Sequence, residues 1–227
     1  MRFPRPLLAV FVASCTTVPK FRYDGTEGTV LADSPSVAAN VAAALDELVP
    51  IVRSYLGSPE DTPVTVYVVK RDSPGSCIYD DLGRTQPAHI ELNRELDTEK
   101  RRRFALYHEL VHWFGQDTWV GNLPLYLEEG VADYLACTSI DAVELRHVEK
   151  PLPPGTTLNL TQLHSITPRE WQKASPEQVD FMYRAGFAVV YRIGIPRLRD
   201  AASGGSLTPT DIRQLFAESV AVGTPRD

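Results

Sequence analysis

Apolar and polar residues follow two different patterns along the chain. Residues 63–70 and 88–93 alternate between apolar and polar positions, which predicts two β-strands. Residues 35–56 and 176–193 are longer stretches rich in apolar residues, and each begins at a proline, which favours the first turn of a helix. Residues 209–220 predict a last amphipathic helix. The order of these elements predicts a compact α+β fold, with a small sheet first and a mainly helical part after it.

A pair of histidines four residues apart is the strongest chemical signal in the chain. On a helix, four residues advance by about 400°, so His108 and His112 lie about 40° apart and one turn apart in rise. Both imidazoles can then bind one metal ion. Glu109 lies about 100° around the helix from His108, where it is poorly placed as a ligand but can take a proton from a water that the metal activates. The motif predicts a zinc site that has its own general base.

An alternative is that the two histidines lie on a buried helix and are held by ordinary hydrogen bonds. The second half of the segment is apolar nearly all round, which predicts a buried helix. The apolar residues are Phe104, Tyr107, Leu110, Val111, Trp113 and Phe114. Buried imidazoles need partners, and one metal ion supplies a partner to both of them, so the surroundings favour the metal.

A catalytic zinc ion normally takes three protein ligands, so the motif predicts a third one elsewhere. Glu129 is the best candidate, because it lies on a second predicted helix that starts near Pro124. Residues 115–122 are long enough to turn the chain back, so the two helices can pack side by side. Asp133 follows four residues after Glu129 on the same face and can accept the outer N–H of a ligand histidine. Glu128 is expected to lie on a solvated acidic face.

These two segments resemble a known family of enzymes. The HExxH motif at 108–112, followed by Leu-Glu-Glu-Gly-Val-Ala-Asp-Tyr at 127–134, is similar to the HExxH and E-G-x-A elements of the gluzincin metallopeptidases. The resemblance is to compact members with a thermolysin-like or aminopeptidase-like core. It implies one Zn²⁺ ion held by His108, His112 and Glu129. It also implies Glu109 as the general base.

Two further expectations come from this resemblance. Residues 181–194 are similar to the Tyr-x-x-Gly-Phe-Ala helix of aminopeptidase-like gluzincins, which implies that Tyr183 stabilises the oxyanion. The alternative is that Tyr183 is a core residue with a satisfied hydroxyl. In zincins an edge strand before the HExxH helix binds extended substrate, and residues 89–92, including His89, are offered for that role. The chain lacks a Gly-rich exopeptidase-type segment and is shorter than the aminopeptidases, so their specificity is not implied.

The amino terminus predicts export. Arg2 and Arg5 precede a short apolar run, which meets small residues and Cys15. Residues 1–14 are predicted to be a lipoprotein signal peptide, because residues 12–15 resemble a bacterial lipobox with Cys15 as the lipidated residue. This predicts a lipid-anchored protein of the bacterial cell envelope, facing outside the cytoplasm. The alternatives are an ordinary secretory signal and a buried amino-terminal strand.

The remaining chain is divided by composition. Residues 15–32 are predicted to be a tether with an extended piece near residues 29–32. Residues 33–227 are predicted to be a zincin-like domain with an α/β part (33–116) and a helical part (117–227). Residues 71–85, between the two predicted strands, are rich in Asp, Gly, Pro and Ser and predict a loop.

Charge and cysteine content narrow the range of partners. The formal net charge is −6, and the basic run at 100–103 is expected to be the solvated start of the zinc helix, so nucleic-acid binding is not predicted. Cys77 and Cys137 remain after Cys15 is assigned to lipid. They are expected either to form a disulfide, which an exported protein permits, or to be two buried thiols.

The resulting hypothesis is a zinc-dependent peptidase that acts on a peptide or protein substrate. One alternative is a zinc-binding envelope protein without useful turnover, acting in binding or assembly. Another is a metal-free interaction lipoprotein.

Overall fold

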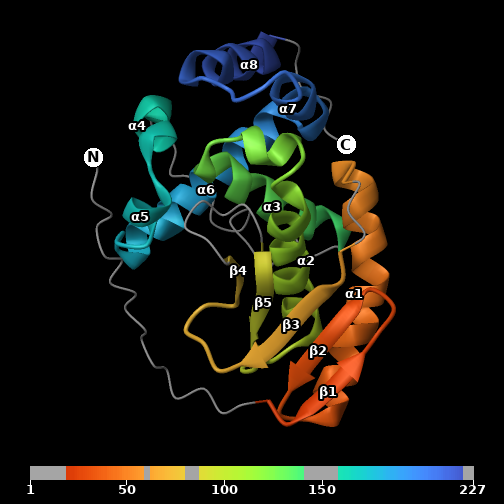
Figure 1. Ribbon diagram of the computed structural model, residues 1–227. Helices are drawn as coiled ribbons and strands as arrows, with labels where there is room; N and C mark the ends of the chain where they lie inside the picture. Colours follow the sequence, from red (N-terminus) through yellow and green to blue (C-terminus); the bar gives the residue numbers. More distant parts are fainter. Residues whose placement is uncertain (1–18, 59–61, 80–86, 141–157, 222–227) are drawn as a thin grey trace, which may run out of the picture.

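The sheet of this protein has five strands in the order β1-β2-β3-β5-β4, with parallel strands in the middle and an antiparallel strand at each edge (Figure 1). The strands are β1 (Phe21–Asp24), β2 (Gly28–Ala32), β3 (Val64–Val69), β4 (Gly75–Tyr79) and β5 (Pro87–Asn93). The computed structural model describes residues 19–58, 62–79, 87–140 and 158–221. The predicted signal peptide, residues 1–14, and Cys15 therefore lie outside the described residues.

Helix α1 (Pro35–Leu56) connects the adjacent parallel strands β2 and β3. The strands bury alternate residues, and Val30 and Val66 belong to the apolar face against which α1 packs. The helix ends at Gly57, whose φ of 72° lies in the left-handed region and whose N–H donates to the carbonyl of Arg53. This βαβ unit contributes to the single hydrophobic core, and its bounds confirm the predicted helix at 35–56 and the predicted strand at 63–70.

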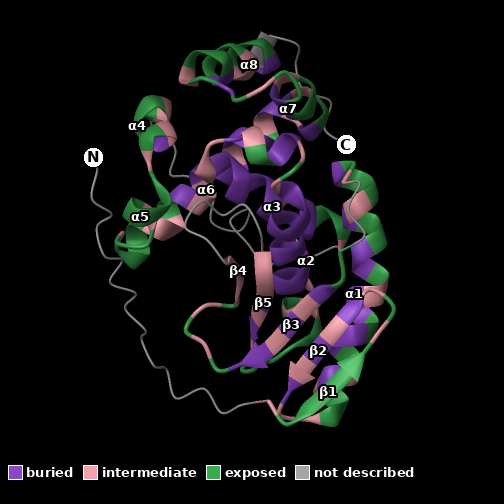
Figure 2. Ribbon diagram, in the orientation of Figure 1, coloured by how far each residue is buried: buried purple, intermediate pink, exposed green. Residues whose placement is uncertain are grey.

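The rest of the chain is helical. The elements are α2 (Glu99–Gly115), the 3₁₀ turn η1 (Trp119–Asn122), α3 (Leu125–Ser139), α4 (Leu160–Ser165), α5 (Pro168–Trp171), α6 (Pro176–Ile193), α7 (Ile195–Ala202) and α8 (Pro209–Ala221). Helix α2 packs against the sheet, and α3 packs between α2 and α6. Figure 2 shows α3 and the second half of α2 as the buried centre of the molecule. The predicted α+β fold, with strands first and helices after, is confirmed.

Helices α3 and α6 cross at two glycines. A Cβ added to Gly130 would lie 2.4 Å from the carbonyl carbon of Gly186, and one added to Gly186 would lie 2.0 Å from the carbonyl oxygen of Tyr126. Any larger residue at either position would push the backbones apart. The crossing therefore fixes how closely α6, which carries Tyr183, approaches the helix that carries Glu129.

Helix α1 is long and apolar enough to cross a membrane, judged by length and composition alone. Its fully buried Leu45 and Val49 nevertheless pack in the core of the sheet and helices. A core helix passes the same test, so this property by itself does not indicate a membrane span.

Three predictions about this part of the chain differ from the structure. Residues 21–24 and 28–32 form β1 and β2 rather than a tether, and Val30 is completely buried because β2 pairs with the central strand β3. The extended piece expected near 29–32 is confirmed as β2. The edge strand beside α2 is β4, not residues 89–92. Those residues belong to β5, which lies between β3 and β4. Strand β4 forms within the stretch 71–85 that was predicted to be a loop.

Cys77 and Cys137 are not bonded to each other, so the disulfide, one of the two alternatives expected from the sequence, does not form. Cys77 is half-buried on β4, and Cys137 is fully buried near the end of α3. Helix α2 packs against both of these elements.

Candidate metal centre

The local sequence explains how α2 and α3 come to lie side by side. Thr98 caps α2 by accepting a hydrogen bond from the backbone N–H of Arg101, which fixes where the helix starts. After Gly115 the chain makes the η1 turn, and Pro124 then precedes the first residue of α3. The two helices are thereby brought together with His108 and His112 on one and Glu129 on the other.

Three atoms from these residues converge on one point. His108 Nε2 lies 3.1 Å from His112 Nε2, and Glu129 Oε2 lies 3.2 Å and 3.3 Å from them respectively. A tetrahedral zinc ion with bonds of about 2.0–2.1 Å needs ligand atoms about 3.3–3.4 Å apart. The triangle therefore has the size of one face of such a coordination sphere. All three residues are buried.

Each histidine is oriented by a carboxylate on its other nitrogen. His108 Nδ1 donates to Asp133 Oδ1 over 2.8 Å, and His112 Nδ1 donates to Glu128 Oε1 over 2.9 Å. A carboxylate only accepts hydrogen bonds, so each Nδ1 carries the proton and each Nε2 can offer its lone pair to a metal. The predicted contact of Asp133 with a histidine is confirmed.

The prediction for Glu128 is wrong. Its side chain is 9% exposed and is a direct partner of His112, whereas a solvated acidic face was expected. Helices α2 and α3 pair in opposite directions, so that the earlier acid of α3 meets the later histidine of α2. The contact between Asp133 and His108 could have indicated this role. If Asp133 pairs with the earlier histidine of α2, the earlier residues of α3, including Glu128, must lie beside the later histidine.

The charges of this cluster shift each other's pKa values. Burial disfavours a charged imidazole, but Asp133 and Glu129 outweigh it and raise the pKa of His108 to about 9. Burial likewise opposes the charge on His112, yet Glu129 and Glu128 hold its pKa well above the ordinary value. The pKa of Glu129 is held well below its usual range by the two histidines, although burial acts the other way. A metal ion that enters the site must therefore displace protons.

Glu109 lies beside the cluster but is not one of the three converging ligands. Its buried carboxylate lies against Gly75 of the edge strand β4, where an added Cβ would be 2.9 Å from Glu109 Oε1. A side chain at position 75 would therefore press on the carboxylate. The importance of Gly75 could not be predicted, because β4 was not expected.

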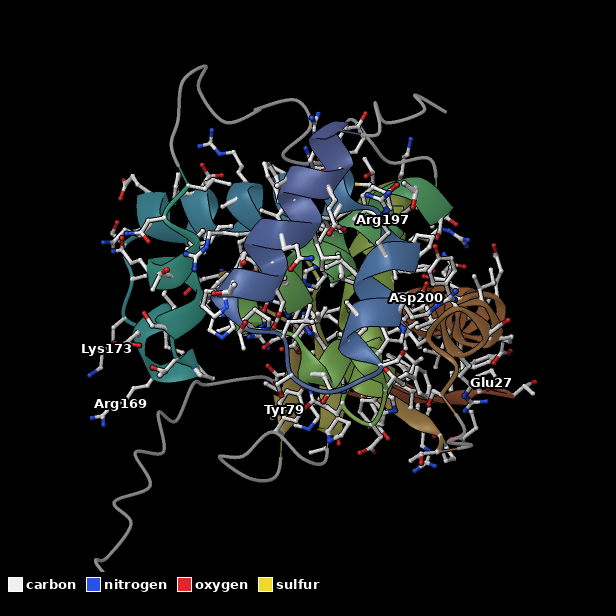
Figure 3. All side chains as sticks on the ribbon, turned by 90° about the horizontal axis from the view of Figure 1, so that it is seen from above. Glu27, Tyr79, Arg169, Lys173, Arg197 and Asp200 are labelled. Atoms are coloured by element: carbon white, nitrogen blue, oxygen red, sulfur yellow. The ribbon has the colours of Figure 1, made fainter. Side chains whose placement is uncertain are left out.

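Tyr183 lies next to the centre. Its ring centroid is 6.2 Å from that of His108, and it meets the ring of Trp171 edge-on with centroids 5.3 Å apart. Trp171 ends α5, whose exposed side chains Arg169 and, just beyond the helix, Lys173 extend into solvent (Figure 3). The α5 segment thus holds Tyr183 against the histidine. The structure brings Tyr183 beside His108, one of the three residues that could hold a metal ion.

His89 does not join the centre. It lies on β5, with its ring edge-on to Tyr67 at a centroid distance of 4.8 Å and its Nε2 3.5 Å from Glu91 Oε1. Its neighbours Ile90 and Leu92 are the residues of β5 that face the core. His89 therefore lies on the other face of the sheet.

The donor set fits a zinc ion. Two imidazole Nε2 atoms and one carboxylate oxygen converge at the spacing that zinc requires, and both Nδ1 atoms already have acceptors. No protein-family model matches the chain, and no curated protein matches it significantly. The chemistry of His108, His112 and Glu129 therefore has to indicate the function.

Proposed function

We propose that the protein is a zinc-dependent peptidase of the gluzincin type. The single observation that carries the proposal is the triangle of His108 Nε2, His112 Nε2 and Glu129 Oε2, with sides of 3.1–3.3 Å. A zinc ion held there supplies Lewis acidity, which polarises a carbonyl group and lowers the pKa of water. The residues around the triangle supply the general base and the oxyanion donor.

Glu109 is the general base in this proposal. Its carboxylate takes a proton from the attacking water as the C–O bond forms at the peptide carbonyl. The same carboxyl group then delivers the proton to the leaving nitrogen as the C–N bond breaks, so that the proton balance closes. Its burial and its contact with Gly75 support the role, because they restrict the carboxylate to one place.

Tyr183 is the oxyanion donor in this proposal. Negative charge develops on the carbonyl oxygen during attack, and a hydroxyl group already held in place stabilises it. The contacts of its ring with His108 and Trp171 support the role, because they keep the side chain beside the centre.

Strand β4 is the part of the molecule that would receive the substrate. Among the described strands it pairs only with β5, so its outer edge can accept the backbone of an extended peptide. It also lies against α2 beside Glu109. This role replaces the one expected for residues 89–92.

The proposed location is the bacterial cell envelope, with a lipid anchor on Cys15. The support is the sequence of residues 1–15, which has the charged, apolar and small-residue parts of a lipoprotein signal. A Cys15→Ala variant is expected to lose incorporation of labelled lipid, and continued labelling would refute the anchor.

The variant Glu109→Gln tests the peptidase. It keeps the size of the side chain and removes the base, so zinc should remain bound at one ion per chain while cleavage of a peptide library is lost. Undiminished cleavage would refute the mechanism. Stoichiometric zinc in the parent protein without any cleavage would indicate a binding protein instead.

A further inference from the structure

The edge strand β4 is attached to the zinc helix α2 at both of its ends. At the start of the strand, Gly75 lies against the carboxylate of Glu109. At its end, the Tyr79 hydroxyl donates to the backbone carbonyl oxygen of His112 over 3.5 Å. Tyr79 is marked in Figure 3. The strand therefore lies along the same two turns of α2 that carry the general base and the second histidine.

A chain of hydrogen bonds continues from Tyr79 to the imidazole of His112. Gln116 Nε2 donates to Tyr79 Oη and to Glu128 Oε1, over 3.4 Å in each case. Glu128 Oε1 in turn accepts from His112 Nδ1 over 2.9 Å. The amide of Gln116 has two N–H groups, so it can serve both acceptors at once.

The position of Gln116 as the C-cap residue of α2 makes this bridge possible. It follows His112 by four residues, so the two side chains share one face of the helix. From there Gln116 reaches β4 on one side and α3 on the other. The described chain of hydrogen bonds passes through the carboxylate on His112 and does not include Asp133, the carboxylate on His108.

We infer that Tyr79 and Gln116 are positioning residues, which couple the placement of β4 to the orientation of the His112 imidazole through Glu128. The inference rests on the proposed function in that β4 receives the peptide and His112 binds zinc. A shift of β4 disturbs Gln116 and then the carboxylate that orients His112. By reciprocity, a metal ion on His112 holds Gln116 and Tyr79 in place and fixes the strand before a peptide arrives.

Zinc affinity, measured by competition with a chelator, tests the coupling without any need for turnover. Gln116→Met keeps the length of the side chain and removes both donors, and it should weaken zinc binding by about tenfold or more, as expected for a lost outer partner of a ligand histidine. Tyr79→Phe removes one hydroxyl and should weaken binding by a smaller factor. The matched controls are Gln162→Met, an exposed residue of α4, and Tyr67→Phe on β3, and neither should change the affinity.

A double-mutant cycle separates coupling from general loosening of the fold. Gln116→Met combined with Glu128→Gln should weaken zinc binding by much less than the product of the two single effects, because both act on one chain. Gln116→Met combined with Asp133→Asn should give the full product, since Asp133 orients the other histidine. The metal-free Gln116→Met variant should keep the melting temperature of the parent, since the ion pairs of both histidines remain in it.

The possible outcomes distinguish this inference from the proposed function. Unchanged zinc affinity in Gln116→Met, or multiplicative effects with Glu128→Gln, overturns the coupling alone. A parent protein that binds zinc but cleaves no peptide refutes the peptidase, while the affinities still decide the coupling. A parent protein that binds no zinc overturns both.

Discussion

Gly130 and Gly186 bring two helix backbones into direct contact, and this contact lies beside the candidate metal centre. Gly130 follows Glu129 directly on α3, and Gly186 lies one turn after Tyr183 on α6. The distance between the proposed oxyanion donor and the proposed third ligand is thus set by the absence of two side chains.

Gly186→Ala should destabilise the protein and displace Tyr183. The added Cβ would lie 2.0 Å from the carbonyl oxygen of Tyr126, which is backbone and cannot rotate away. Overpacking of this kind costs about 1–3 kcal/mol. Thermal or denaturant unfolding measures the effect, and Gly204→Ala, whose Cβ would be 3.6 Å from its nearest neighbour, is the control. Equal stability of the two variants would contradict the tight crossing.

Tyr183→Phe should lower kcat by about a hundredfold or more, because the loss of one oxyanion donor typically has that effect. Zinc content should stay the same, since the tyrosine is not one of the three converging ligands. Tyr191→Phe on the same helix is the control, because that side chain is exposed. A full rate in Tyr183→Phe would reduce the residue to a packing role.

Gly75→Ala should impair the chemical step without loss of metal. Its Cβ would come within 2.9 Å of Glu109 Oε1, so the carboxylate must move by several tenths of an ångström. Misplacement of a catalytic group by about 1 Å can cost about a hundredfold, and a loss of about tenfold in kcat is expected for this smaller shift. Ser76→Ala, the next residue on β4, is the control. A kcat of Gly75→Ala equal to that of the control would show that the Glu109 carboxylate can accommodate the added methyl group without loss of function.

The metal-free protein should lose stability as the pH rises from about 6.5 to about 9. The pKa of His108 is raised to about 9 in the folded protein. The stabilisation from its protonated form is therefore complete below the unfolded value near 6.5 and disappears as the pH passes through the folded value. Melting temperatures of chelator-treated protein across this range measure the effect.

Zinc affinity should rise over the same pH range, because the metal must displace protons from the histidines. Calorimetric titrations in buffers of different ionisation enthalpy would detect the released protons. Zinc binding at pH 7 without proton release would contradict the raised pKa values.

Part of the fold and of the site could be predicted from local sequence. The spacing of His108 and His112 and that of Glu129 and Asp133 are properties of single helices, and the helical repeat alone places each pair on one face. Strands β3 and β5 alternate clearly because one of their faces is buried.

The parts that could not be predicted depend on how the elements pack. Glu128 is oriented toward His112 only by the antiparallel contact between α2 and α3. Strand β4 shows no alternation, since all five of its residues are half-buried, and it lies within a stretch rich in turn-forming residues. Its pairing with β5 and its contact with α2 determine its conformation, and neither is visible in the local pattern.

The carboxylates around the histidines also determine what the protein can do before it meets a metal ion. Protonated imidazoles of His108 and His112 pair with the carboxylates of Asp133, Glu128 and Glu129, so the buried charges of the cluster balance one another. Small zinc modules, by contrast, are unfolded without their metal. In this chain the protonated histidines can balance the buried carboxylates, so we expect the fold to form before any metal ion binds.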